Sequence, residues 1–186
     1  MKRSIDLAVA VTLAILLLPL MAVIGTIVFA TDRGPVLHWS SRVGRHGRVF
    51  LMPKFRSMKA GTPQVATDRL SDPRAHLTPI GGVLRKLSLD ELPQLWSVIR
   101  GDMSLVGPRP ALYNQHELIA ARRASGVDSL QPGITGWAQV NGRDELTDQE
   151  KLALDGDYLR RAGLIMDMRI LALTVFRVVR RDGVAH

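Results

Sequence analysis

The chain has 186 residues and no cysteine, so it suits one domain with a small appendage and holds neither a disulfide framework nor a thiolate metal site. Its five histidines are scattered, and it has neither a Walker A lysine motif nor the glycine motif of dinucleotide-binding folds. The formal net charge of +8 at pH 7 indicates an anionic partner, such as lipid head groups, a phosphorylated substrate or nucleic acid.

The first predicted element is an uncharged apolar segment, residues 7–30. As a helix rising 1.5 Å per residue it would be about 36 Å long, enough to cross a hydrocarbon core of about 30 Å. Three interpretations compete: a cleaved signal peptide, a simple transmembrane span, and a re-entrant hairpin that enters and leaves by one leaflet. The apolar run is much longer than the signal-peptide core of about 7–15 residues, which disfavours the first.

Charge and one proline favour the re-entrant hairpin over the span. Lys2 and Arg3 precede the segment, and four arginines follow it: Arg33, Arg42, Arg45 and Arg48. The positive-inside rule places both flanks on the cytoplasmic side, which a straight span cannot satisfy. Pro19 lies near the middle and removes one helical hydrogen bond, so it can kink the helix there. Proline also occurs in ordinary spans, so the simple span stays open.

A β-hairpin is predicted next, with short strands at residues 36–40 and 49–52. The loop between them, residues 42–48, is rich in arginine and glycine. That composition suits a phosphate or an anionic surface, and equally a plain solvated turn. Lys54 and Arg56 fall on one side if the second strand continues, since side chains alternate along a strand. Residues 59–77 lack periodicity and are predicted to form a mobile loop.

The central feature of the sequence is the run 87–95, in which Asp90 and Glu91 stand side by side before a proline. Ser88 and Glu91 fit a capping box, so a helix is predicted to begin here or, alternatively, at Pro93, which suits a first helical position. A buried helical piece is predicted at residues 94–99. Two carboxylates on a first helical turn often do no more than cap it. Alternatively, adjacent helical residues point about 100° apart, so one carboxylate could attack phosphorus while its neighbour holds a metal.

Two rigid loops follow the acidic pair. In the first, Arg109 stands between two prolines, which aims its guanidinium firmly, as bidentate phosphate recognition requires. The second loop, residues 131–143, is rich in glycine. It holds the kinds of side chain that a nucleotide or sugar pocket needs: Trp137, Gln139, Asn141 and Arg143. A packed structural loop is the competing interpretation.

Helical composition marks residues 111–125 and 163–181. On a helical wheel of the second segment, the arginines gather on one side: Arg169, Arg177, Arg180 and Arg181. The remaining face is apolar, which resembles an interfacial helix lying on anionic lipid. A surface helix packed on the core fits the same pattern.

The order of these motifs resembles the bacterial sugar transferases, the monotopic phosphoglycosyl transferases that start surface-glycan assembly. The matching runs extend over essentially the whole chain: Gly44-Arg45, residues 54–58, 88–95, 101–110 and 132–143, Leu154-Asp155, Tyr158, Asp167 and Ile170-Leu171. The chain departs from the family at Leu18, where a serine precedes the kink proline, and at Pro53, where an aromatic is common.

The resemblance implies an α+β fold in two parts. Residues 1–30 would form a re-entrant helix-kink-helix anchor. Residues 31–186 would form a small, mostly helical catalytic domain with a short β-hairpin and interfacial amphipathic helices. The implied location is the cytoplasmic face of the bacterial inner membrane. The implied reaction transfers a sugar-1-phosphate from a UDP-sugar to polyprenyl (undecaprenyl) phosphate, through a covalent aspartyl-phosphosugar intermediate, and releases UMP.

The resemblance also implies roles for residues. Asp90 would be the nucleophile, and Glu91 would act beside it and help to hold Mg²⁺. The expected substrate-binding residues are Lys54, Arg85 and Arg109, together with Gln139, Asn141 and Arg143 of the second rigid loop. A carboxylate-held Mg²⁺ that keeps waters and binds substrate phosphates needs no histidine or cysteine.

A membrane-tethered basic protein that binds or scaffolds without catalysis is the competing function. Nucleic acid is not expected as a partner, because the sequence shows no series of base-stacking aromatics. An anionic phospholipid membrane is expected as a partner. The sequence leaves open which sugar is transferred, and whether the protein is a homo-oligomer.

Overall fold

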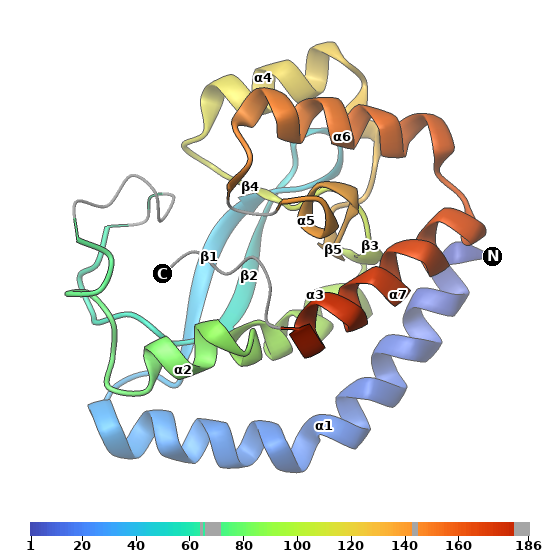
Figure 1. Ribbon diagram of the computed structural model, residues 1–186. Coiled ribbons are helices and arrows are strands. Elements are labelled where there is room, and N and C mark those ends of the chain that lie inside the picture. Colours follow the sequence, from blue (N-terminus) through green and yellow to red (C-terminus); the bar gives the residue numbers. More distant parts are fainter. Residues whose placement is uncertain (64, 66–71, 143–144, 181–186) are drawn as a thin grey trace.

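The computed structural model describes residues 1–63, 65, 72–142 and 145–180 and has an α+β fold (Figure 1). A long helix, α1, curves around one side of a small domain. A β-hairpin stands near the centre of that domain, and shorter helices surround it. The predicted fold class, with an apolar N-terminal helix and a small helical domain that contains a hairpin, is confirmed.

Helix α1 runs unbroken over Lys2–Asp32 and is long and apolar enough to cross a membrane. Pro19 lies inside it and cannot donate a helical hydrogen bond, and the helix bends near its middle (Figure 1). Side chains around the bend are exposed, among them Ile15 at 67%, Leu16 at 68% and Leu18 at 63%. The outer face of α1 around the bend therefore points away from the domain, while Ala14 and Leu17 pack against its core.

The N-terminal end of α1 is docked on the domain by a cluster of buried polar groups. Asp6 is buried and accepts a 2.7 Å hydrogen bond from the Ser104 hydroxyl. Lys2 donates to the Asp167 carboxylate at 2.6 Å, and the Tyr158 hydroxyl donates to the other oxygen of Asp167 at 2.6 Å. A buried carboxylate without such partners would be costly, so these bonds fix where α1 starts on the domain.

The C-terminal end of α1 is held by the same domain. Asp32 forms a 2.8 Å ion pair with the buried Arg56 just beyond the hairpin. About one and two turns before it, Val28 and Ile24 are buried in an apolar cluster with Phe55 of the hairpin. Both ends of one continuous helix are thus fixed to one body, and the outer face of the helix between them is exposed.

Three strands form the first sheet, in the spatial order β2-β1-β4. They are β1 (Leu37–Val43), β2 (Val49–Phe55) and the short β4 (Ala111–Leu112). β1 and β2 make the predicted antiparallel hairpin, and each strand is longer than the sequence indicated. The predicted loop is therefore shorter, and it contains a 3₁₀ turn, η1 (Arg45–Gly47).

A second, parallel pair joins β3 (Ser104–Val106) to β5 (Gly133–Thr135). The backbones meet so closely beyond β3 that a Cβ on Gly107 would overlap the Gln131 carbonyl oxygen. The Gly107 N–H donates to the Thr135 carbonyl at 2.9 Å, which holds the loop that begins there. Glycine is required at this crossing because any side chain would separate the two strands.

The acidic run lies between two short helices, α2 (Gly81–Lys86) and α3 (Leu95–Arg100), and forms a 3₁₀ helix, η3 (Leu89–Gln94). Asp90 and Glu91 occupy its first turn, as predicted. The predicted capping box was wrong: Ser88 adopts a left-handed φ of 54° and its side chain makes no capping hydrogen bond. The reason is that Glu91 is drawn to two cations of the domain instead of turning back to cap its helix.

The remaining helices are α4 (His116–Ala124), η4 (Val127–Ser129), α5 (Trp137–Val140), α6 (Asp148–Arg161) and α7 (Leu164–Arg180). Helices α4 and α6 lie side by side (Figure 1). A capping box does exist at α6, where Thr147 and Glu150 bond reciprocally. The predicted helix at 111–125 starts later, because its first two residues pair with β1.

Helix α7 confirms the helical prediction for its segment and is apolar on both sides. Met166 and Ile170 are buried in the main core. Facing outward are Ile165 at 89% exposed, Met168 at 58% and Val175 at 65%. An exposed apolar stripe of this kind needs an apolar neighbour outside the domain.

Candidate active site

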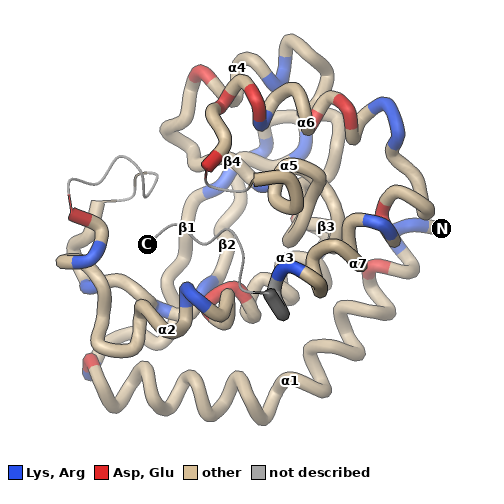
Figure 2. The backbone as a smooth tube through the Cα atoms, viewed as in Figure 1, with Lys and Arg blue, Asp and Glu red and all other residues tan. Residues whose placement is uncertain are grey.

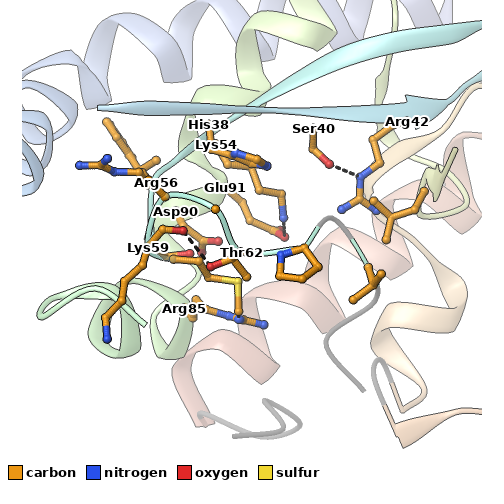
Figure 3. A pocket seen from close by; sticks show the side chains of 18 of the residues that line it. His38, Ser40, Arg42, Lys54, Arg56, Lys59, Thr62, Arg85, Asp90 and Glu91 are labelled. Atoms are coloured by element: carbon orange, nitrogen blue, oxygen red, sulfur yellow. Dashed lines mark hydrogen bonds and ion pairs between the residues drawn. The ribbon is translucent and has the colours of Figure 1, made fainter. Parts of the chain in front are cut away.

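A pocket of about 520 Å³ opens between the hairpin and η3 (Figure 3). Both hairpin strands, α2, η3 and the loop before β4 contribute to its walls. The charged and hydrogen-bonding side chains that line it are His38, Ser40, Arg42, Lys54, Arg56, Ser57, Lys59, Thr62, Arg85, Asp90, Glu91 and Arg109. The pocket is therefore strongly basic around a single acidic pair.

The hairpin supplies its share by strand alternation. His38, Ser40 and Arg42 line the pocket from β1 at every second position, and Lys54 lies opposite His38 on β2. Arg42 is held in place by the Ser40 hydroxyl at 3.0 Å and the Pro110 carbonyl at 3.1 Å. One face of the hairpin is thus committed to cations and hydrogen-bond donors.

Glu91 forms the centre of the charge network. Lys54 Nζ and Arg109 Nη2 each donate to its carboxylate at 2.8 Å, and both reach the same oxygen, Oε1. Only 14% of the Lys54 side chain and 12% of the Glu91 side chain are exposed, so water screens these pairs little. Burial alone would raise the pKa of Glu91, but the Arg109 guanidinium and the Lys54 ammonium hold it well below its usual range.

Asp90 has the opposite electrostatics. It is 7% exposed, and burial raises the pKa of its carboxyl group, with Lys54 opposing the shift and Glu91 adding to it. The two adjacent carboxyl groups therefore have opposite pKa shifts and suit different roles. Glu91 is a permanent anion neutralised by two cations, whereas Asp90 is a desolvated carboxylate beside the open pocket. Pairs of carboxyl groups whose pKa values are pushed apart are typical of active sites.

The cations around the pair crowd one another. Burial, followed by repulsion from Arg109, lowers the pKa of Arg42 to about 10. Burial also lowers the pKa of Lys54, against the attraction of Glu91. Figure 2 shows the red acidic segment between α2 and α3 lying beside the blue basic segment of α2. An anionic ligand in the pocket would relieve this excess of positive charge.

Arg109 is positioned from behind by a second arginine. Arg122 of α4 donates through Nη1 to the Arg109 carbonyl oxygen at 2.8 Å. Its Nε and Nη2 donate to the Asp155 carboxylate on α6 at 3.1 and 2.6 Å. Asp155 is 1% exposed, so this is a buried ion pair that fixes the backbone of the loop.

The structure brings together five of the predicted site residues on this pocket: Lys54, Arg85, Asp90, Glu91 and Arg109. Two others lie elsewhere. Gln139 lines a separate cavity, where its amide nitrogen donates to the Ile134 carbonyl at 2.8 Å. Asn141 is exposed and donates to the Trp137 carbonyl. Arg143 lies outside the described residues.

Sequence reasoning missed His38 and Ser40, and it placed Arg42 in the connecting loop instead of on a strand. The polar residues at positions 38, 40 and 42 alternate, which was the available signal. Arg122 was also missed. Its role depends on α4 and α6 meeting, and no local pattern encodes that contact.

A metal ion would have few protein ligands here. No group of three His, Cys, Asp or Glu side chains in the described part of the chain could hold one. Mg²⁺, however, is often held by one or two carboxylates together with substrate phosphates and waters. Glu91 suits that mode, since both of its ion pairs use Oε1 and its second oxygen faces a different direction.

The opposite electrostatics of the two carboxylates give a stability prediction. Glu91→Gln leaves Lys54 and Arg109 without a counter-charge and should lower the unfolding free energy by about 3 kcal/mol at pH 7. Because the pKa of Glu91 is depressed in the fold, this difference should shrink as the pH falls towards that pKa. Asp90→Asn should be neutral or stabilising at pH 7, since a carboxyl with a raised pKa opposes folding once ionised.

Thermal unfolding of both variants in detergent micelles, at pH 7 and pH 4, measures this. Equal melting temperatures for the two variants at pH 7 would contradict the division of roles between the carboxylates.

Comparison with known proteins connects this site to a family. The sequence model of the family described as bacterial sugar transferase matches residues 1–181. A UDP-galactose-lipid carrier transferase from Erwinia amylovora is 38% identical over 98% of this chain. An undecaprenyl-phosphate glucose phosphotransferase from Komagataeibacter xylinus is 40% identical over 96% of it. An uncharacterized sugar transferase, EpsL, from Bacillus subtilis is 39% identical over 99%.

The relatives differ in length. The chain spans 41% of the Erwinia protein and 36% of the Komagataeibacter protein, but 90% of the Bacillus protein. The matched part includes the acidic run, the hairpin and the Arg109 loop.

Proposed function

Because the chain belongs to the bacterial sugar transferase family, we propose that it transfers a sugar-1-phosphate from a UDP-sugar to polyprenyl phosphate and releases UMP. This would be the first step in building a surface glycan or exopolysaccharide. The observation that carries the proposal is the buried acidic pair of Asp90 and Glu91 in a 520 Å³ pocket crowded with cations. A UDP-sugar brings the diphosphate that such a pocket attracts.

The transfer would proceed in two displacements on phosphorus. An oxygen of Asp90 attacks the β-phosphorus of the donor, and the bond from that phosphorus to the bridging oxygen breaks, so UMP leaves with the electron pair. A phosphate oxygen of the lipid then attacks the aspartyl-bound phosphorus. This second step breaks the acyl-phosphate bond, restores the Asp90 carboxylate and forms polyprenyl diphosphate sugar. Carboxylates serve as nucleophiles towards phosphorus in covalent catalysis.

The cations would supply most of the rate enhancement, because phosphoryl transfer depends mainly on positioning and charge neutralisation. Arg109 presents its guanidinium from a loop that is fixed by two prolines and by Arg122. Lys54 and Arg42 approach from the hairpin. Together they would hold the diphosphate in line with Asp90 and stabilise the negative charge on the departing UMP.

Mg²⁺ is proposed as the cofactor, held by Glu91 and by the donor diphosphate. When bound, it neutralises phosphate charge and orients the leaving group. The Lys54 and Arg109 pairs with Glu91 keep that carboxylate ionised and aimed at the pocket.

The helix α1 is proposed to enter and leave the cytoplasmic leaflet of the bacterial inner membrane. Two features support a re-entrant arrangement over a span. The contacts of Asp6 and Asp32 tie both ends of the helix to one domain, and the exposed apolar side chains lie at the bend between them. The exposed apolar stripe of α7 supports a domain that rests on the membrane surface.

Cysteine labelling tests the topology, since the chain has no native cysteine. We expect a cysteine added before Met1 and the single substitution Ala60→Cys to be protected from a membrane-impermeant maleimide in intact cells. Both should react once the cells are opened. Labelling of the N-terminal cysteine alone in intact cells would establish a span.

Release of UMP tests the function. Purified protein in lipid nanodiscs would be incubated with Mg²⁺, undecaprenyl phosphate and single UDP-sugars, starting with UDP-galactose and UDP-glucose because the names of two relatives specify these sugars. We expect UMP release that chelation by EDTA stops, together with a lipid-linked sugar. A tethered scaffold protein would give neither product with any donor.

A further inference from the structure

We propose that a second cavity, on the other side of Glu91 from the donor pocket, binds the head and first isoprene units of the polyprenyl phosphate acceptor. The cavity has a volume of about 310 Å³. It is formed by α1, η3, α5 and α7, and Glu91 lines both it and the donor pocket. This inference rests on the proposed function and adds where the lipid substrate binds.

The walls of the cavity are mostly apolar. Apolar side chains from several helices and both parallel strands line it, among them Leu13, Leu17, Leu95, Leu105, Ile134 and Leu171. Two of its polar groups, the hydroxyls of Thr135 and Thr174, bond to each other at 2.7 Å. A cavity of this size, with mostly apolar walls and a few polar groups, is typical of a small-molecule site.

The identity of the occupant follows from where the cavity leads. Leu13 and Leu17 belong to the apolar helix α1, one turn apart and just before its bend. A lipid chain that lies along α1 can therefore enter the cavity without crossing a polar surface. The isoprenoid tail matches these leucine walls in the same way that it matches the membrane interior.

The charged residues that line the cavity fit a phosphate. Lys86, just before the acidic run, and Arg177 of α7 both line the cavity together with Glu91. Because Glu91 is already paired with Lys54 and Arg109, these two further cations can attract another anion. The combination of apolar walls with two lining cations favours an anionic amphiphile over a neutral one.

The arrangement explains how two very different substrates can reach one nucleophile. In a 3₁₀ helix, which has three residues per turn, neighbouring side chains point about 120° apart. Asp90 lines the donor pocket, whereas Glu91 reaches the boundary between the two cavities. The nucleotide would therefore leave on the hairpin side while the lipid phosphate approaches the phosphosugar from the α1 side.

A matched pair of variants on α1 tests the acceptor site. Leu17→Trp should fill the cavity and raise the KM for undecaprenyl phosphate about 10- to 100-fold, the usual cost of a lost apolar fit. The lipid-independent release of UMP from the donor should keep its wild-type rate. Leu16→Trp, one residue away and 68% exposed, should leave both quantities unchanged. Equal KM values in the two variants would overturn the proposal.

A binding measurement covers the case in which Leu17→Trp fails to fold. Wild-type protein in nanodiscs would be irradiated with a polyprenyl phosphate that carries a diazirine in its first isoprene unit, and the adduct mapped by mass spectrometry. We expect labelling of Ile134 or Leu171, which undecaprenyl phosphate suppresses and phosphatidylglycerol does not. Labelling confined to exposed α1 residues such as Leu16, or competition by phosphatidylglycerol, would overturn it. Photolabelling measures only where the lipid binds. Release of UMP without lipid measures the proposed donor chemistry, so failure of one proposal can be told apart from failure of the other.

Discussion

Asp90→Asn is expected to abolish both turnover and covalent labelling, lowering the rate by about 10⁴-fold or more, as removal of a catalytic nucleophile does. An amide is a far poorer nucleophile than a carboxylate, and the neighbouring carboxylate of Glu91 is already held by Lys54 and Arg109. The measurement is incubation with a labelled UDP-sugar in the absence of lipid, followed by mapping of a phosphosugar adduct. Wild-type protein should form up to one adduct per chain, and the variant none.

Steady-state kinetics give an independent answer to the same question. A covalent route predicts ping-pong kinetics, with parallel double-reciprocal plots, because UMP leaves before the lipid reacts. Asp148→Asn on the exposed surface of α6 is a matched control and should behave like wild type. Intersecting plots together with no adduct in wild-type protein would instead make Asp90 a metal ligand, with the lipid phosphate attacking the donor directly.

The rate of the first step, release of UMP, should depend on pH through the ionisation of Asp90. Since the pKa of Asp90 is raised by burial, the rate of UMP release should climb with pH at values above the usual aspartate range, as Asp90 becomes ionised. Glu91 is ionised throughout, because its pKa is depressed, and should contribute nothing to that limb.

Arg109→Ala is expected to lower turnover by about 10²- to 10³-fold, the usual cost of losing one group that stabilises charge in a transition state. The guanidinium contacts Glu91 directly, and its side chain is 32% exposed towards the pocket, so the loss should affect chemistry more than folding. Initial rates of UMP release with saturating donor measure the effect.

Two further variants sharpen the interpretation of Arg109. Arg109→Lys should recover only part of the loss, because an ammonium cannot reproduce the planar, two-point grip of a guanidinium on phosphate. Arg160 lies on the surface of α6, so Arg160→Ala is the control and should leave turnover unchanged. Near-wild-type turnover of Arg109→Ala would mean that the residue serves only to hold Glu91.

The sequence predicted the parts of the fold that have strong local patterns. The hairpin follows from its strand composition, and α7 from its helical periodicity. The sequence also marks the acidic pair and Arg109 as candidate site residues, because prolines beside them restrict the backbone. The ion pairs that join Glu91 to Lys54 of β2 and to Arg109 are tertiary contacts. The order of the motifs implied them only through the family resemblance.

The rest depends on contacts between distant segments. Strands β3, β4 and β5 have two or three residues each, too few for a periodic signal, and they exist because of their pairing partners. The capping-box prediction was wrong for the same reason. Glu91 pairs with Lys54 and Arg109, which come from other segments, instead of capping its own helix. Gln139 and Asn141 were chosen by residue type, and type alone does not say which cavity a loop faces.

The polar cluster that docks the start of α1 sets an order of events during synthesis. Lys2 and its partner Asp167 are 165 residues apart in the chain. At a translation rate of about 5–20 residues per second, roughly 10–30 s pass between the emergence of the two. Until Asp167 emerges, α1 lacks part of the surface on which it docks, and its exposed leucines and isoleucines need another apolar environment. We therefore expect the nascent helix to reach lipid first, and the rest of the domain to assemble on a helix that is already in place.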